Sequence, residues 1–330
     1  MKRVYFFIAM IIYCSFSAAQ DPHFSQYYAS QATVNPAATG MFTGDMKVSG
    51  LYRQQWPQYG NAFISGTTAL EWKPNGFKDG QNPNRLAFGG MIMYDKTPDE
   101  VLKSHYAAAM IAYHKALDET GNHRLGLGFM AVYNQKMLDA SQLTFANQFQ
   151  SGGFTTGGGE LIASRTTSSF DINTGLLYSY EDEDKLIYGG ASLYHLLQPK
   201  EYFLQQNEMM DFLPRRWNFH AGVNIRSNEI QYAASVLLMR QQHVNELLIG
   251  GMIGIPFGED GNVLYAGSWY RAGESLIPTI NLQWKTMNLG LSYDTDINSK
   301  TQLTHPRSLE LSLAYRIAPF RDYKTGCFSF

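Results

Sequence analysis

The sequence has few charged residues and almost no cysteine. Charged side chains make up 16% of the 330 residues, against about a quarter in an average soluble protein. The net charge is −2, so no basic surface points to nucleic acid, and we expect no nucleic-acid partner. The two cysteines are Cys14 and Cys327. Cys14 lies in a predicted leader, which leaves one thiol and excludes an internal disulfide.

Long apolar runs are missing after residue 20, so no membrane-spanning helix is predicted there. The first residues instead have the layout of a secretory signal peptide. Lys2 and Arg3 precede the apolar core "VYFFIAMIIY", and small residues precede Gln20. The alternative is a membrane anchor helix, but the apolar run is short for one. We therefore expect residues 1–19 to be a signal peptide, cleaved near Ala19.

Motifs of catalysis and of cofactor binding are missing as well. The chain has no nucleophile elbow, no H-E-x-x-H pair and no Walker loop. Its eight histidines are scattered, without metal-ligand spacing. The glycine-rich stretch 151–160 lacks the G-K-[ST] ending of a phosphate-binding loop and is typical of a surface loop. We expect a protein that is not an enzyme, with no cofactor and no metal. An outer-membrane hydrolase remains as an alternative.

What the chain has in abundance is alternation of apolar and polar residues, the pattern of a strand with two unlike faces. Near residue 220, Trp217 and Phe219 alternate with Asn218 and His220. The segments with this pattern run near 47–56, 62–73, 84–95, 104–117, 123–135, 168–181, 184–196, 215–227, 229–240, 244–257, 261–272, 275–285, 287–297 and 307–317.

A soluble β-sandwich also alternates, but three features favour a membrane β-barrel. The segments mostly exceed the length of about five to six residues that is usual in globular sheets. Isolated charges such as Arg53, Glu71 and Glu310 lie on the polar face, where a closed sandwich core would have to pair them. Aromatic residues lie at segment ends, as in the girdles of outer-membrane barrels. These aromatic residues are Trp56, Trp72, Tyr94, Tyr133, Tyr180, Trp217, Trp284 and Tyr315.

The joins between segments are of two kinds, tight turns and long polar stretches. "SNE" is tight, whereas "KPNGFKDGQNP" at 73–83 and the stretch 137–167 are long. Outer-membrane barrels have short turns on one side of the membrane and longer loops on the other. We expect the long joins of this chain to share one side.

These patterns predict an all-β fold, a transmembrane antiparallel β-barrel of about 14 strands. The barrel is expected at 47–317, after an irregular N-terminal segment at 20–46 and before a C-terminal tail at 318–330. Irregular backbone cannot face lipid, because its N–H and C=O groups would lack partners. We therefore expect the segment in the lumen or at the periplasmic mouth, with its aromatic side chains against the inner wall.

The opening of this segment resembles the start of a known family. "DPHFSQYYASQATVNPAATG", followed by "LYRQQW", is similar to the PorP/SprF outer-membrane proteins of Bacteroidota. That family typically begins with D-P-x-F-S-Q-Y, then N-P-A, then Y-R-x-Q-W. The matching residues are Asp21, Pro22, Phe24, Ser25, Gln26, Tyr27, Asn35, Pro36, Ala37, Tyr52, Arg53, Gln55 and Trp56. The similarity covers essentially the whole mature chain, but the "GCFSF" tail departs from the C-P-R-F-like ending that is frequent in the family.

The resemblance implies a monomeric, non-enzymatic outer-membrane barrel of the type IX secretion system. Its implied partners are the lipid bilayer, periplasmic secretion components and the C-terminal sorting domain of a secreted surface protein such as a gliding adhesin. A passive channel or small-molecule transporter is the alternative. Candidate residues for lumen, plug or partner contacts are Asp21, Phe24, Gln26, Tyr27, Tyr28, Asn35, Arg53, Trp56, Arg216 and His220.

Overall fold

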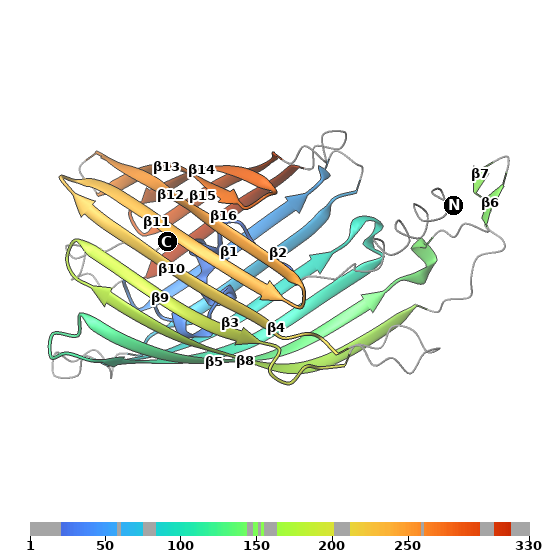
Figure 1. Ribbon diagram of the computed structural model, residues 1–330, viewed down its shortest axis with the longest axis horizontal. Coiled ribbons are helices and arrows are strands. Elements are labelled where there is room, and N and C mark those ends of the chain that lie inside the picture. Colours follow the sequence, from blue (N-terminus) through green and yellow to red (C-terminus); the bar gives the residue numbers. More distant parts are fainter. Residues whose placement is uncertain are drawn as a thin grey trace, which may run out of the picture.

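A closed antiparallel barrel dominates the computed structural model, which describes residues 21–57, 61–74, 84–143, 148–150, 153–154, 164–200, 212–258, 261–297 and 307–317. Within these residues, 14 strands form the barrel (Figure 1). They are β1 (Met46–Gln55), β2 (Phe63–Trp72), β3 (Arg85–Lys96), β4 (Leu102–Ala116), β5 (His123–Leu138), β8 (Arg165–Glu181), β9 (Lys185–Tyr194), β10 (Arg216–Ser227), β11 (Ile230–Gln241), β12 (Val244–Phe257), β13 (Asn262–Arg271), β14 (Ser275–Trp284), β15 (Met287–Asp296) and β16 (Arg307–Ile317). β1 pairs with β16 and closes the ring.

Each segment predicted from alternation overlaps one barrel strand, so the predicted fold is confirmed. One small element escaped the pattern: β6 (Phe149–Gln150) and β7 (Gly153–Phe154) pair outside the barrel, in the connection from β5 to β8. β8 also starts at Arg165, earlier than predicted. Its first residues "RTTSS" carry no apolar alternation, but they pair with the end of β5.

Burial in the barrel is inverted relative to a soluble protein. On β16, Leu309, Leu311 and Leu313 point outward and are exposed, whereas Ser308 and Glu310 point inward and are buried. An apolar outer face and a polar inner face are what a lipid-embedded barrel requires. The aromatic residues predicted to form the girdle follow this rule in part. Trp56, Trp72, Tyr133, Trp217, Trp284 and Tyr315 are exposed, and Tyr94 and Tyr180 are partly buried.

The two ends of the barrel differ in their connections. Turns such as 228–229 and 285–286 lie at the end where β1 begins, the short-turn end, whereas 139–164 and 195–215 lie at the opposite, long-loop end. The prediction that all long joins share one side was wrong for 73–84, which joins β2 to β3 at the short-turn end. Successive strands run in opposite directions, so joins alternate between the two ends of the barrel. The join after β2 therefore lies at the end where β1 began. Short turns mark the periplasmic side of outer-membrane barrels.

Residues 21–45, here called the lumen segment, run through the inside of the barrel. They contain two 3₁₀ turns, η1 (Tyr27–Thr33) and η2 (Pro36–Ala38). Most side chains from Phe24 to Gly40 are buried. The segment begins near the start of β10 at the long-loop end, and its last residue bonds to the end of β16 at the short-turn end. The predicted placement of an irregular segment inside the barrel is confirmed.

Some expectations fall on other parts of the chain. The predicted signal peptide (1–19), the C-terminal tail (318–330) and most of the glycine-rich stretch lie outside the described residues. None of the helices in the described residues is long and apolar enough to cross a membrane.

Candidate functional site

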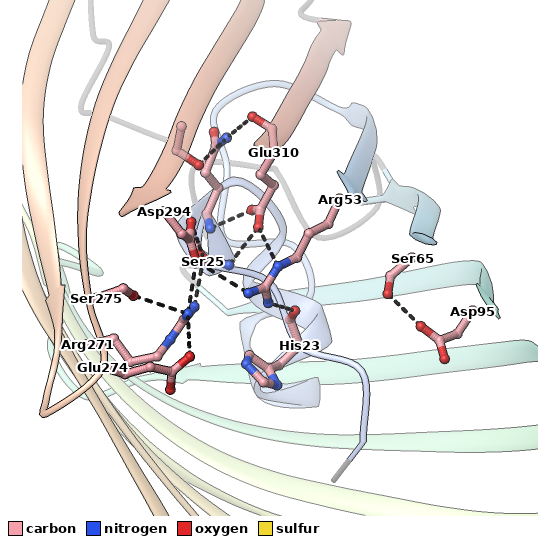
Figure 2. A network of polar contacts seen from close by, with 12 residues as sticks. His23, Ser25, Arg53, Ser65, Asp95, Arg271, Glu274, Ser275, Asp294 and Glu310 are labelled. Carbon is pink, nitrogen blue, oxygen red and sulfur yellow. Dashed lines mark hydrogen bonds and ion pairs between the residues drawn. The ribbon is translucent and has the colours of Figure 1, made fainter. Parts of the chain in front are cut away.

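A buried carboxylate of the wall, Glu310, holds the start of the lumen segment. Glu310 of β16 is fully buried and accepts two consecutive backbone hydrogen bonds (Figure 2). The N–H of Ser25 donates to its Oε2 at 2.8 Å, and the N–H of Gln26 donates to its Oε1 at 2.6 Å. The Gln26 side chain donates to the Glu310 carbonyl oxygen at 2.9 Å. These three hydrogen bonds attach the start of the lumen segment to β16.

Two wall arginines complete the network around this carboxylate. Arg53 of β1 donates to the carbonyl oxygen of His23 at 2.6 Å and lies 3.3 Å from Asp294 of β15. Arg271 of β13 donates to the same Asp294 carboxylate at 2.8 Å and to the hydroxyl of Ser25 at 2.7 Å. Figure 2 shows these side chains converging on the segment. Arg53 and Glu310, which are isolated charges in the sequence, are therefore paired with charged groups of nearby strands and with the segment.

Aromatic side chains of the segment pack on the same wall. Tyr28 stacks on Trp269 of β13, with ring centroids 4.6 Å apart. The Tyr27 hydroxyl donates to Ser235 of β11 at 2.7 Å, and Phe24 is buried in the same cluster. Burial raises the pKa of both tyrosines, so their hydroxyls stay protonated. In the structure, these three rings pack against the inner wall, as predicted.

Further along, Asn35 fixes the second turn of the segment. Its Oδ1 accepts the N–H of Ala37 at 2.9 Å, which caps η2. Its Nδ2 donates to the Leu176 carbonyl oxygen at 3.0 Å and lies 2.9 Å from His220 Nε2. The backbone passes so close to the wall that a Cβ on Gly128 of β5 would collide with the Ala37 nitrogen.

Replacing Gly128 by alanine should push the lumen segment away from the wall. The methyl group would overlap the backbone of η2, which cannot give way like a flexible side-chain end. We expect a lower melting temperature and faster hydrogen exchange over residues 33–40. Gly66→Ala is the matched control, because its Cβ would have ordinary contacts only. Equal effects of both substitutions would contradict the close packing.

The N-terminal end of the segment is held by a second set of charges. The Asp21 carboxylate lies 2.6 Å from His195 Nε2 and 3.1 Å from Arg216. The other ring nitrogen of His195 lies 2.6 Å from Asp171 of β8. Burial opposes ionisation of Asp21, but Arg216 and His195 lower its pKa. Burial likewise opposes protonation of His195, but the two carboxylates raise its pKa. The imidazolium thus bridges two carboxylates.

This bridge should make the stability of the barrel depend on pH. Because the pKa of His195 is raised from 6.5, its contribution is complete below 6.5 and is lost as the pH rises through the raised value. Because the pKa of Asp21 is lowered from 3.8, its contribution is lost only as the pH falls well below 3.8. We expect the melting temperature to fall as the pH rises above 6.5. The variant His195→Gln should show a smaller fall, and an equal fall would contradict the bridge.

The structure brings most of the predicted residues together. Asp21, Phe24, Gln26, Tyr27, Tyr28, Asn35, Arg53, Arg216 and His220 line the contact between segment and wall. Trp56 lies apart, because its side chain is 42% exposed and packs edge-to-face on Phe63.

Several contact residues were not among the candidates. Glu310 was recognised on the polar face of its strand, and inward alternation also places Asp294 in the lumen. Arg271 is the last residue of β13, and alternation also places it inward, whereas His195 directly follows β9.

Comparisons with known proteins identify a matching family and similar structures. A family model described as type IX secretion system membrane protein PorP/SprF matches residues 16–315. No curated protein matches the chain. The Pseudomonas putida toluene transporter TodX is similar in structure, with 11% identity, a TM-score of 0.51 and coverage of 89% of this chain and 97% of TodX. A Pseudomonas aeruginosa FadL homologue has 9% identity, a TM-score of 0.49 and coverage of 87% and 94%. At these identities the likeness to TodX shows a shared fold alone.

Proposed function

Because the chain belongs to the PorP/SprF family of type IX secretion system membrane proteins, we propose that it is a non-enzymatic outer-membrane barrel that binds a secreted surface protein. The secreted protein is held through its C-terminal sorting domain, at the long-loop end. Periplasmic components of the secretion system are contacted at the short-turn end. Export by a signal peptide cleaved near Ala19 is part of the proposal, as is a role in anchoring gliding adhesins in a Bacteroidota cell.

One structural observation supports a partner-binding barrel in addition to the family membership. The lumen is occupied by a segment of the chain itself. Phe24, Tyr27 and Tyr28 pack on the wall, and the Glu310 carboxylate holds the backbone beside them. A barrel closed in this way is suited to presenting its two ends to protein partners. It is poorly suited to passing solutes, because a buried segment would first have to leave its contacts.

The proposal is tested by deleting the gene in the source bacterium. We expect at least one secreted protein with a C-terminal sorting domain to disappear from the cell surface, as measured by mass spectrometry of protease-shaved surface peptides. The wild-type gene supplied on a plasmid should restore it. Unchanged display of every sorting-domain protein would contradict the proposal.

Passive transport is the second candidate, favoured by the shared fold with TodX, which is a toluene transporter. Transport would require the lumen segment to move aside, against the hydrogen bonds of Ser25 and Gln26. Liposomes that contain the purified barrel should take up labelled small sugars no faster than empty liposomes. Saturable uptake by the wild-type barrel would favour the transporter.

A further inference from the structure

A partly open pocket lies at the short-turn end, between the barrel wall and the last part of the lumen segment. Residues 40–43 of the segment line it together with Arg85 of β3, Arg124 of β5 and Glu181 of β8. Lys73, which follows β2, lies beside it, with its Nζ 4.3 Å from the centre of the Phe42 ring. We call this the basic pocket. It is formed jointly by residues of the wall and of the segment.

Positive charge exceeds negative charge in the basic pocket. Nη1 of Arg85 and Nη1 of Arg124 lie 3.2 and 3.1 Å from the same oxygen, Oε2 of Glu181. Two guanidinium groups therefore share one carboxylate. The side chain of Arg124 is nine-tenths buried. Its Nε has no hydrogen-bond partner among the described residues. A buried polar atom of this kind normally has a partner, so it marks a place for one.

Lys73 is a third basic side chain close to the two arginines. Its ammonium group donates to the carbonyl oxygen of Phe42. Burial, followed by the charge of Arg85, lowers the pKa of Lys73 to about 7. The nearby Lys47 does not add to the excess, because Glu71 neutralises it at 3.0 Å. The two guanidinium groups alone therefore exceed the single carboxylate of Glu181 by one positive charge.

We propose that the basic pocket binds a carboxylate of a periplasmic partner protein. Arginine is suited to this ligand, because its planar fork of N–H donors matches a carboxylate. A protein is favoured over a lipid headgroup because Arg85 and Arg124 lie on the inward face of their strands, away from the outer face that meets lipid. The inference rests on the proposed function for the periplasmic orientation of this end. It deepens that function by giving the partner a docking site on the lumen segment.

Binding is tested on the purified full-length mature barrel in detergent. The probe is a fluorescein-labelled peptide of glycine and glutamate with a free C-terminus, followed by fluorescence anisotropy at low salt. We expect Arg124→Gln to weaken binding about tenfold. Glu181→Gln should instead strengthen binding, because it removes the carboxylate that competes for both guanidinium groups. A purely structural role of Glu181 would not produce tighter binding.

Arg226→Gln is the matched control. Arg226 lies at the same end, but it pairs at the exposed surface with Asp184 at 3.0 Å. Equal weakening by Arg124→Gln and Arg226→Gln would overturn the proposal, because it would indicate a general effect of net charge. Two other results would overturn the proposal in favour of a phosphate ligand. One is tighter binding of inorganic phosphate than of the peptide. The other is tighter binding of the barrel to anionic vesicles than to neutral vesicles, provided that this preference is lost in the Arg124→Gln variant. Because the assay measures only binding to the purified barrel, its failure is distinct from unchanged surface display in the gene deletion.

Discussion

Removal of residues 21–40 should turn a closed barrel into a conducting pore. These residues fill the lumen between the wall strands, and the wall closes on itself without them through the pairing of β1 with β16. The inner faces of the strands carry many polar and charged side chains beside apolar ones, so we expect water and ions to enter the vacated space. In planar bilayers, we expect steady single-channel currents from the deletion variant and none from the wild-type barrel.

The deletion also removes partners from buried charges on the wall. The variant should therefore melt at a lower temperature as well as conduct, since Glu310 and Arg53 lose contacts to the segment. If the variant fails to assemble, Gly128→Ala provides a milder test, because it loosens the segment without removing it. A deletion variant with unchanged conductance and unchanged melting would show the segment to be a solvent-exposed tether.

Replacing Glu310 by alanine should release the segment from the wall. The substitution leaves the N–H groups of Ser25 and Gln26 without their acceptor and removes one of the partners of Arg53, whose Nε lies 3.9 Å away. Breaking a buried charged contact by removing one partner costs about 3–5 kcal/mol. We expect a loss of stability of that order in denaturant titrations. Hydrogen exchange over residues 24–28 should become faster at the same time.

Two further variants separate the charge of Glu310 from its shape. Glu310→Gln keeps one acceptor oxygen and should lose less stability than the alanine variant. Glu229→Ala removes an exposed carboxylate from a turn and should change stability by less than about 0.5 kcal/mol. A Glu310→Ala barrel as stable as the Glu229→Ala barrel would show that the carboxylate does not hold the segment.

The strands of this fold could be predicted from the sequence because their residues alternate between a face toward the lumen and an apolar face toward lipid. Leu309, Leu311 and Leu313 show this alternation without interruption. The β6–β7 pair could not be predicted, since two-residue strands have no period to detect. The direct pairing of β5 with β8 agrees with the prediction of two consecutive barrel strands joined by one long stretch.

The position of the lumen segment could be predicted from physics, but its partners could not. Irregular backbone next to lipid is excluded, so the segment had to lie inside or at a mouth. Ser25 and Glu310, however, are separated by 285 residues, and no local pattern links them. His195 and Asp21 are also far apart in the sequence, and only the folded structure brings them into contact. Polar residues on the inner face indicated a set of possible contacts without indicating which pairs form.

The most direct test of a partner-binding barrel is an affinity pull-down from detergent-solubilised outer membrane. The barrel carries an affinity tag on an exposed turn such as 228–229, and mass spectrometry identifies the proteins that co-purify. An untagged strain provides the background. We expect a secreted surface protein with a C-terminal sorting domain, together with periplasmic secretion components. Recovery of the barrel alone, from cells that display their full set of surface proteins, would contradict partner binding as its function.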